Sequence, residues 1–308
     1  MRRITLLVVA SVAALAVSGA SRSAGSVQAR WVMTDLGTLG GKSSEAVAIN
    51  ERGQVIGYSG APGPKGFRQH AFLWENGKMR DLGTLGGKLS KAVAINERGQ
   101  VIGWWAASGA RSYRTFLWEN GKMRDLGYGV PVAINERGQI LMNSSSRASV
   151  WTKGGKRDLG TLYATRDPRG AGYGESEGKA INGRGQIVGS SGTASSETHA
   201  FLWESGKMRD LGTLGGQYSE AVSINERGQV VGSSNNADDR THAFLAENGK
   251  LRDLGARIVK DSGAVAVNGR GQVIGNRYTG PSWVWEDGKM RDLGTLSRPY
   301  GGCVAVSG

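Results

Sequence analysis

Cysteine is almost absent from this chain. Cys303 is the single cysteine among 308 residues, which excludes a disulfide framework and any multi-cysteine zinc or iron–sulfur site. Only three histidines are present, so there is little room for histidine-rich metal chemistry. The sequence therefore predicts neither a metal nor another cofactor.

Long apolar runs are scarce too. One run covers residues 4–17, follows a short basic start with Arg2 and Arg3, and precedes a series of small residues. That order is typical of a secretory signal peptide, and the run is shorter than the ~20 residues that span a bilayer as a helix. We expect cleavage near residue 29 and a single domain at residues 30–308, extracellular or periplasmic, with no membrane span. An uncleaved anchor is the alternative.

Glycine and positive charge are abundant. The chain holds 50 glycines, and its 39 lysines and arginines against 26 acidic residues give a formal net charge of +13. Apolar residues make up 39%, which is enough for a core and argues against disorder. The charge points to an anionic partner. Export and the lack of a recognised motif argue against nucleic acid.

A repeat fills the remainder of the chain. Between successive Asp-Leu-Gly tripeptides lie the same four short apolar segments, which in the first copy are residues 45–50, 54–57, 70–74 and 78–83. Segments of four to six residues bounded by Gly or Asn predict strands rather than helices. Asn-Glu-Arg-Gly and Glu-Asn-Gly-Lys are typical of tight turns that join the first strand to the second and the third to the fourth. The tripeptide begins at Asp35, Asp81, Asp125, Asp158, Asp210, Asp253 and Asp292.

Four antiparallel strands in each unit of ~45 residues, repeated around a ring, predict an all-β fold of the β-propeller type. Six complete sets fit within residues 45–294. An outer strand at residues 31–37 and an inner strand at residues 303–307 are left over. Two arrangements are open: six blades with surplus end strands, which we favour, or a seven-blade ring with an incomplete closing blade.

The string His-Ala-Phe-Leu-Trp-Glu-Asn-Gly-Lys-Met-Arg-Asp-Leu-Gly, which starts at His70, resembles the HAF-type bacterial extracellular repeat family, named for His-Ala-Phe. The motif recurs at His199 and His242 and degrades in the other copies. The resemblance covers essentially the whole chain after the signal peptide. It implies an exported repeat protein of β-propeller type, and it brings no established activity and no catalytic residue.

The repeated polar residues are interpreted as architectural. The three histidines share one position at the start of the third strand, and Arg114 and Arg147 replace them in two copies, which no shared metal would tolerate. We expect each Asp-Leu-Gly aspartate to accept hydrogen bonds from backbone N–H groups at a turn. The tryptophans that end the third strand, such as Trp74, are expected to pack between blades.

The remaining two connections of each repeat vary widely in length, and they should lie together on the face opposite the constant turns. Loops on a rigid scaffold are where binding residues usually lie. Arginines beside aromatic residues can stack on sugars and pair with anions. The pair Trp104 and Trp105 is the sharpest candidate. The predicted ligand-binding residues are Arg68, Trp104, Trp105, Arg111, Tyr113, Tyr163, Arg166, Arg169, Arg277 and Tyr278.

Two functions follow as hypotheses. The first is a non-catalytic, monomeric scaffold that binds an anionic extracellular polymer, such as an acidic polysaccharide, or a protein partner through its variable loops. The second is an extracellular hydrolase or lyase that acts on polysaccharide, for which Asp167, Glu175 and Glu177 are the acidic candidates outside the repeat pattern.

Overall fold

The computed structural model describes residues 33–62, 68–107, 109–110, 112–163, 174–255, 261–278 and 280–294. These residues form strands, turns and bridges without any helix, so the predicted all-β class is confirmed. No helix in the described part of the chain is long and apolar enough to cross a membrane. The expected signal peptide at residues 1–29 and the expected inner strand at residues 303–307 lie outside the described residues.

The strands fall into six sets of four, which we call blades 1 to 6. Blades 1 to 3 comprise β1 (Ser44–Ile49), β2 (Val55–Ala61), β3 (Arg68–Glu75), β4 (Lys78–Gly83), β5 (Leu89–Ile95), β6 (Val101–Ala106), β7 (Arg114–Glu119), β8 (Lys122–Tyr128), β9 (Val130–Ile134), β10 (Ile140–Ser144), β11 (Arg147–Thr152) and β12 (Gly155–Asp158). Blades 4 to 6 comprise β13 (Ser176–Ile181), β14 (Ile187–Gly192), β15 (Thr198–Glu204), β16 (Lys207–Gly212), β17 (Gly215–Ile224), β18 (Val230–Asn236), β19 (Thr241–Glu247), β20 (Lys250–Asp253), β21 (Ser262–Val267), β22 (Val273–Arg277), β23 (Ser282–Glu286) and β24 (Lys289–Gly294).

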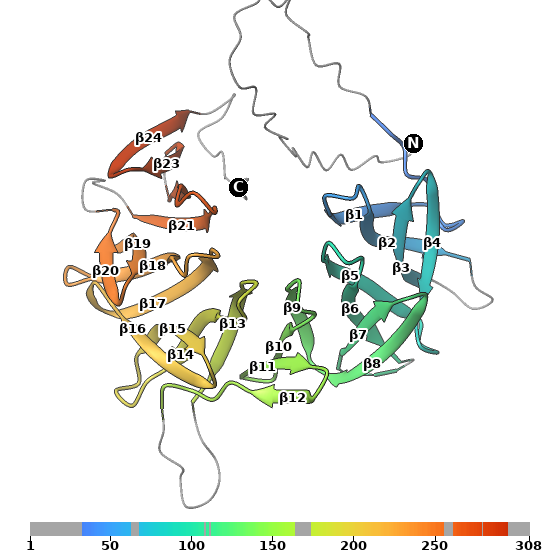
Figure 1. Cartoon of the computed structure of the whole chain (residues 1–308), viewed down its shortest axis with the longest axis horizontal. Helices are drawn as coiled ribbons and strands as arrows, with labels where there is room; N and C mark the ends of the chain where they lie inside the picture. Colours follow the sequence, from blue (N-terminus) through green and yellow to red (C-terminus); the bar gives the residue numbers. More distant parts are fainter. Residues whose placement is uncertain are drawn as a thin grey trace, which may run out of the picture.

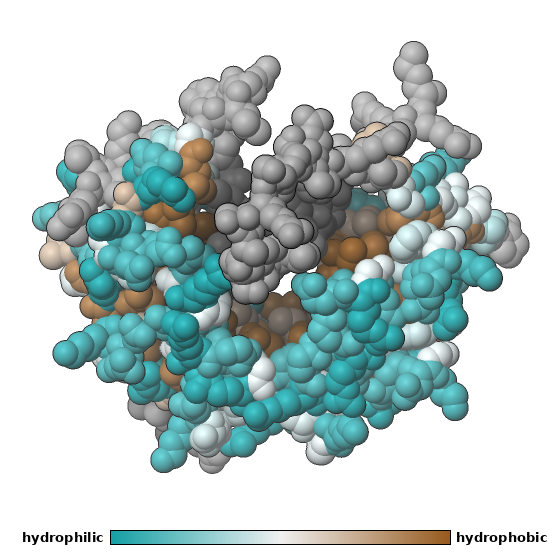
Figure 2. Space-filling view, turned by 45° about the horizontal axis from the view of Figure 1, so that its top comes forward, coloured by the Kyte–Doolittle hydropathy of each residue, from teal (hydrophilic) through white to brown (hydrophobic). Residues whose placement is uncertain are grey.

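Each blade is an antiparallel meander whose first strand lies nearest the centre and whose fourth lies at the circumference (Figure 1). A parallel pairing of Gln69 with Leu89 joins blades 1 and 2 into one eight-stranded sheet, and Thr198 with Tyr218 joins blades 4 and 5. In Figure 2 the visible rim is largely hydrophilic, and hydrophobic residues gather around the central hollow. Val47 and Ile49 of the inner strand β1 are among the exposed apolar residues.

The core lies between the blades rather than within them. Five apolar clusters join neighbouring blades, and in the first of them Ile56 and Leu73 of blade 1 pack against Phe116 of blade 2. A Cβ on Gly103 of the second strand would come within 2.1 Å of the Lys91 carbonyl oxygen on the inner strand and within 2.5 Å of the Phe116 ring. The carbonyl contact recurs at Gly57, Gly189 and Gly232. This close approach explains why glycine ends the recurring Gln-Val-Ile-Gly segment.

The constant turn between the first and second strands also joins blades. The Asn50 side-chain amide donates to Gln54 Oε1 at 2.8 Å and to the backbone carbonyl of Asn96, one blade further on, at 3.1 Å. The same carbonyl bond runs from Asn96, Asn135, Asn182 and Asn225 to the asparagine of the following blade. A buried amide that makes these bonds cannot be replaced without loss, which explains the constancy of the motif.

The segment before β1 differs from the prediction. No strand forms in residues 33–37, the described part of the expected outer strand. Nevertheless, Ser44 Oγ donates to the Gly37 carbonyl at 2.6 Å, as Ser90 Oγ does to Gly83 between blades 1 and 2. Ser90 Oγ additionally accepts the Ala71 N–H from the third strand of the preceding blade at 2.9 Å. Figure 1 shows the blades as an arc that is open between blade 6 and blade 1.

Candidate functional site

The turns and loops separate onto two faces, as the sequence predicts. Ile49 pairs with Val55, Val55 with Trp74, and Trp74 with Met79, so the first-to-second and third-to-fourth turns lie at one end of each sheet. We call these the inner and outer turns, and this end the short-turn face. The variable connections lie at the opposite end, the loop face.

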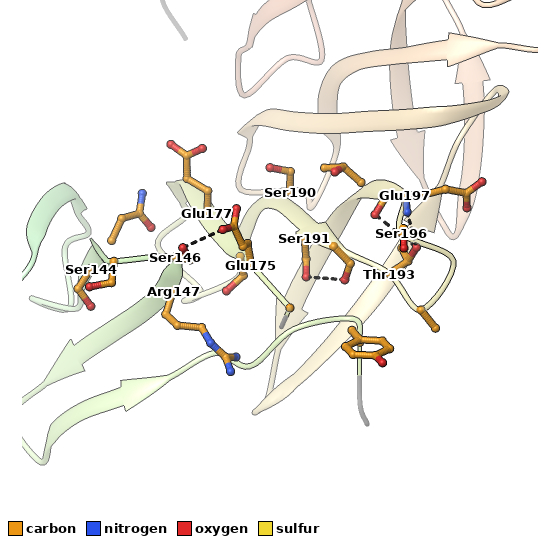
Figure 3. A pocket seen from close by; sticks show the side chains of 18 of the residues that line it. Ser144, Ser146, Arg147, Glu175, Glu177, Ser190, Ser191, Thr193, Ser196 and Glu197 are labelled. Carbon is orange, nitrogen blue, oxygen red and sulfur yellow. Dashed lines mark hydrogen bonds between the residues drawn. The ribbon is translucent and has the colours of Figure 1, made fainter. Parts of the chain in front are cut away.

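A groove of about 650 Å³ lies on the loop face between blades 3 and 4. Three segments form it: the turn between β10 and β11, the residues just before β13, and the loop between β14 and β15. In Figure 3 the side chains of Arg147, Glu175 and Glu177 lie on one side of it, and those of Ser191 and Thr193 on another. Tyr163, one of the predicted ligand residues, also lines it. The remaining lining is mostly serine, threonine and glycine, which leaves a polar, open site.

Acidic side chains dominate the groove. Among the described residues that line it are three glutamates, Glu175, Glu177 and Glu197, and one basic residue, Arg147. Ser146 Oγ donates to Glu175 Oε1 at 2.9 Å (Figure 3). An anionic ligand would meet like charge here, whereas hydroxyl groups would meet both acceptors and donors.

A lysine beside the groove connects two blades. Lys179 Nζ lies 2.9 Å from both Glu177 Oε1 of blade 4 and Glu220 Oε1 of blade 5. Burial on its own would lower the pKa of Lys179, but the hydrogen bonds to both glutamates raise it above its ordinary value. The same carboxylates face Tyr218, and burial with the Glu220 charge raises the Tyr218 pKa to about 12. Lys179 therefore stays charged and fixes Glu177 at the edge of the groove.

An aromatic cluster occupies the loop-face half of blades 1 and 2. The Trp104 and Tyr113 rings lie 4.4 Å apart between centroids and are tilted by 50°. Lys91 Nζ lies 3.9 Å from the Tyr58 ring centroid and 5.8 Å from that of Trp104. Tyr58 donates a short hydrogen bond to Glu45, and burial followed by this contact raises the Tyr58 pKa to about 12. Tyr113 is 49% exposed and presents an aromatic surface to solvent.

The other predicted ligand residues are not brought together. The position of Trp105 corrects the prediction that it binds a ligand. Its side chain is 9% exposed, packs in the core between blades 1 and 2, and donates its indole N–H to Asp125 at 3.2 Å. Arg277 is paired with Asp292 at 2.7 Å. Tyr278 is 85% exposed in blade 6, and Arg68 begins β3 half-buried. Arg111, Arg166, Arg169 and the acidic candidate Asp167 lie outside the described residues.

The repeated polar residues are structural, as predicted. Asp81 Oδ1 accepts the Gly83 N–H at 2.7 Å, and its other oxygen lies 2.7 Å from His70 Nδ1. The His–Asp pairing recurs at His199 and His242, and Arg114 takes the same place against Asp125. The tryptophans Trp118 and Trp203, which end the third strand, are buried in the clusters between blades.

Sequence reasoning missed the inner-strand residues Lys91, Lys179 and Glu220. A signal was present, because the first residue of the inner-strand motif changes from copy to copy as Glu45, Lys91, Val130, Glu177, Glu220 and Gly263. Lys179 likewise stands where the other copies have valine. Such departures within a constant strand mark side chains that the core does not require.

Comparisons with known proteins bear on the fold. A scan against protein-family models finds no match, and a search of curated proteins finds no relative. Among solved structures, the chain is similar to the β-propeller domain of the Trilobed protease from Pyrococcus furiosus, described as having an open velcro topology. The identity is 9%, the TM-score is 0.52, and 82% of this chain and 84% of that one are covered. This similarity shows that the chain has a β-propeller fold.

Two further structures give weaker similarity. An acylaminoacyl peptidase in complex with Z-Gly-Gly-Phe-chloromethyl ketone has 8% identity and a TM-score of 0.49, over 82% of this chain and 46% of that one. The extracellular domain of a one-component system protein from B. thetaiotaomicron has 9% identity and a TM-score of 0.47, over 85% and 36%. The chain thus spans less than half the length of either.

Proposed function

We propose that this chain is an exported, non-catalytic β-propeller that binds a polyhydroxylated ligand, an oligosaccharide, on its loop face. The observation that carries the proposal is the groove between blades 3 and 4. Its volume of about 650 Å³ lies within the usual range for ligand sites. The resemblance to HAF-type repeats and the apolar run at residues 4–17 support export. The monomeric state expected from the sequence belongs to the same proposal.

The lining matches the chemistry of sugar hydroxyls. Glu175 accepts hydrogen bonds, Arg147 donates them, and the serine hydroxyls do both. The ring of Tyr163 offers an apolar face to the carbon skeleton of a sugar. We expect a neutral or amino sugar here rather than an acidic one, because the glutamates outnumber the arginine. The half-buried Trp104 and the exposed Tyr113 would together contact a longer ligand elsewhere on the same face.

Binding to an array of neutral oligosaccharides, followed by calorimetry on the strongest ligand, tests this proposal. Arg147→Ala, Glu175→Gln and Tyr163→Ala should each weaken binding about tenfold, the usual cost of one good polar or stacking contact. Arg240→Ala is the matched control, because Arg240 is an exposed loop-face arginine outside the groove. Binding that ignores all three groove substitutions, or no binding to any neutral glycan, would contradict the proposal.

A polysaccharide hydrolase is the second candidate, and one observation favours it: Glu175 and Glu177 both line the groove. Glycoside hydrolysis commonly uses two carboxyl groups on either side of the scissile bond. The ion pair between Glu177 and Lys179 argues for a fixed rather than a reacting carboxylate. Release of reducing ends from a polysaccharide, abolished in Glu175→Gln/Glu177→Gln, would favour the enzyme over the binding scaffold.

On blade number, the sequence favours six blades with surplus end strands, but we propose the other arrangement, in which the end segments form an incomplete closing blade beside six complete ones. The support is the contact of Ser44 with Gly37, which repeats the contact that Ser90 makes with the outer strand of the preceding blade. The second support comes from blade 6. Its residues Ile274 and Ser282 lie on the face that corresponds to the one by which blade 1 packs on blade 2, so this face can take a further blade. Residues 303–307 are the proposed inner strand.

A further inference from the structure

Among the described residues, positive charge is concentrated on one face of the ring. Two sets of residues make up the short-turn face. They are the five residues of each inner turn, from Asn to Gln, and the six residues of each outer turn, from the end of the third strand to the third residue of the fourth. Together they hold nineteen basic and ten acidic side chains, a net of +9. The remaining described residues hold nine basic and fifteen acidic side chains, a net of −6. The segments between strands that the structure does not describe hold six basic residues and one acidic residue. Within the described part of the chain, the excess positive charge therefore lies on the short-turn face.

A ring of arginines forms the centre of this face. Every inner turn contributes one exposed arginine, and successive turns are in contact around the axis. The Nη1 of Arg52 donates to the Glu97 carbonyl at 3.3 Å, and that of Arg98 to the Glu136 carbonyl at 3.4 Å. The six are Arg52, Arg98, Arg137, Arg184, Arg227 and Arg270.

These arginines form no ion pair among the described residues, although four of the six inner turns also hold an exposed glutamate. Among the described residues, all but one of the ion pairs lie in the loop-face half, and the exception joins Arg124 to Glu119 at 4.0 Å. None of the six inner-turn arginines has a carboxylate within salt-bridge distance in this part of the chain. The nearby Glu97 carboxylate instead accepts the Glu51 backbone N–H at 3.0 Å. A guanidinium has five N–H donors, so the bond to one carbonyl orients it and leaves donors for a ligand.

The face suits a polymer better than a lipid surface. The inner and outer turns hold none of the large exposed apolar residues of the described chain, and Ile49, next to the first inner turn, borders them. Binding to a membrane interface draws on buried apolar area in addition to charge. Exposed guanidinium groups around the axis, four of them held by a carbonyl of the next turn, and the lysines that begin the outer strands can pair with carboxylates repeated along a chain.

We propose that the short-turn face binds a linear acidic polysaccharide, separately from the loop-face groove. The sequence predicted an anionic partner but placed it on the variable loops, where Arg114 and Arg277 prove to be paired with Asp125 and Asp292. The inference does not depend on the proposed function, because the two sites lie at opposite ends of the sheets and take ligands of different charge.

Binding of the purified exported chain to polygalacturonate at low and high salt tests the inference. Lys78→Gln/Lys122→Gln/Lys207→Gln removes three exposed cations for which no ion pair is present among the described residues, so folding should be preserved. We expect about tenfold weaker binding at low salt, and loss of wild-type binding at high salt. The matched control, Lys42→Gln/Lys88→Gln/Arg240→Gln, removes the same charge from the loop face and should bind as the wild type does.

A second variant tests the guanidinium groups themselves. Arg52→Lys/Arg98→Lys keeps the charge but loses the planar donor fork, so binding should weaken several-fold. If the two triple-substitution variants of the preceding paragraph weakened binding equally, the effect would depend on net charge alone, and the inference would be overturned. No binding to the polymer, or binding to phosphatidylglycerol vesicles alone, would also overturn it. Neutral-oligosaccharide binding in the groove should survive in every one of these variants, which separates failure here from failure of the proposed function.

Discussion

Trp104 and Trp105 are adjacent in β6 yet belong to different environments. Trp105 points into the core between blades 1 and 2, where its indole N–H donates to Asp125 at 3.2 Å. Trp104 is half-buried and its ring lies 4.4 Å from that of Tyr113, which is partly in solvent. Successive strand residues point to opposite faces of a sheet, so the pair divides into one structural and one surface side chain.

Substitution of each tryptophan should therefore give a different result. Trp105→Ala should lower the free energy of unfolding by about 3–5 kcal/mol, the usual cost of emptying a buried aromatic site. Trp104→Ala should cost less than about 1 kcal/mol and act on ligand binding instead. Urea denaturation followed by far-UV circular dichroism measures both. Equal destabilisation by the two substitutions would contradict the assignment.

The asparagine of the inner turn should be among the most sensitive positions of the ring. Asn96 donates to the Asn135 carbonyl of the next blade at 3.1 Å and to Gln100 Oε1 at 2.8 Å. Asn96→Ala removes the link between blades, and it also removes the donor to Gln100 Oε1 and the acceptor of the Gln100 N–H. It should therefore cost about 2–3 kcal/mol in chemical denaturation. Asn76→Gly is the control, because Asn76 is exposed in an outer turn with φ of 50°, which glycine adopts freely. A loss below that of the control would show that the link between blades is not stabilising.

The strands and their order could be predicted because each depends on a local pattern. Short apolar segments bounded by Asn-Glu-Arg-Gly or Glu-Asn-Gly-Lys fix the hairpins, and the aspartate of Asp-Leu-Gly bonds to a backbone N–H only two residues away. Because the motif recurs in six copies, each correct local inference applies to all six blades. Nothing in these inferences required knowledge of which blades touch.

The site was predicted less well because it depends on pairing between strands. Arg277 was expected to contact a ligand, but the meander of blade 6 places its guanidinium 2.7 Å from Asp292, fifteen residues further on. The basic charge was counted for the whole chain, although most of it belongs to the constant turns rather than to the loops. The charge separation follows from the motifs once their common face is recognised, whereas the groove depends on how blades 3 and 4 pack.

The Arg114–Asp125 pair should make stability depend on pH in the acid range. Burial would raise the pKa of Asp125, but Arg114, the Gly127 N–H and the Trp105 indole together lower it below its ordinary value. A carboxylate with a lowered folded pKa stabilises the fold above its unfolded pKa of about 3.9, and the contribution is lost as pH falls through the folded pKa.

Unfolding free energies measured from pH 6 down to pH 2 should therefore fall more steeply for the wild type than for Asp125→Asn. Asp287→Asn provides the control, because Asp287 lies in the exposed outer turn of blade 6 with φ of 49°, a conformation that asparagine accepts. Parallel curves for the wild type and Asp125→Asn would show that the pair contributes no acid-dependent stability.

The single cysteine permits a direct test of the proposed closing blade. Ala264 of β21 packs against Ala243 and Val231 of blade 5, and Cys303 holds the corresponding position of the proposed inner strand. Its partners on blade 6 would be Ser282 and Ile274, which match Ala243 and Val231 in the strand registers. Because cysteines join only when their Cα atoms lie within about 7 Å, Ser282→Cys or Ile274→Cys should form an intrachain disulfide with Cys303 on mild oxidation of dilute protein. Tyr278→Cys, at an exposed loop-face position of the same blade, should stay reduced. Non-reducing electrophoresis and peptide mapping distinguish these outcomes, and equal oxidation of all three variants would reflect random collision rather than a seated strand.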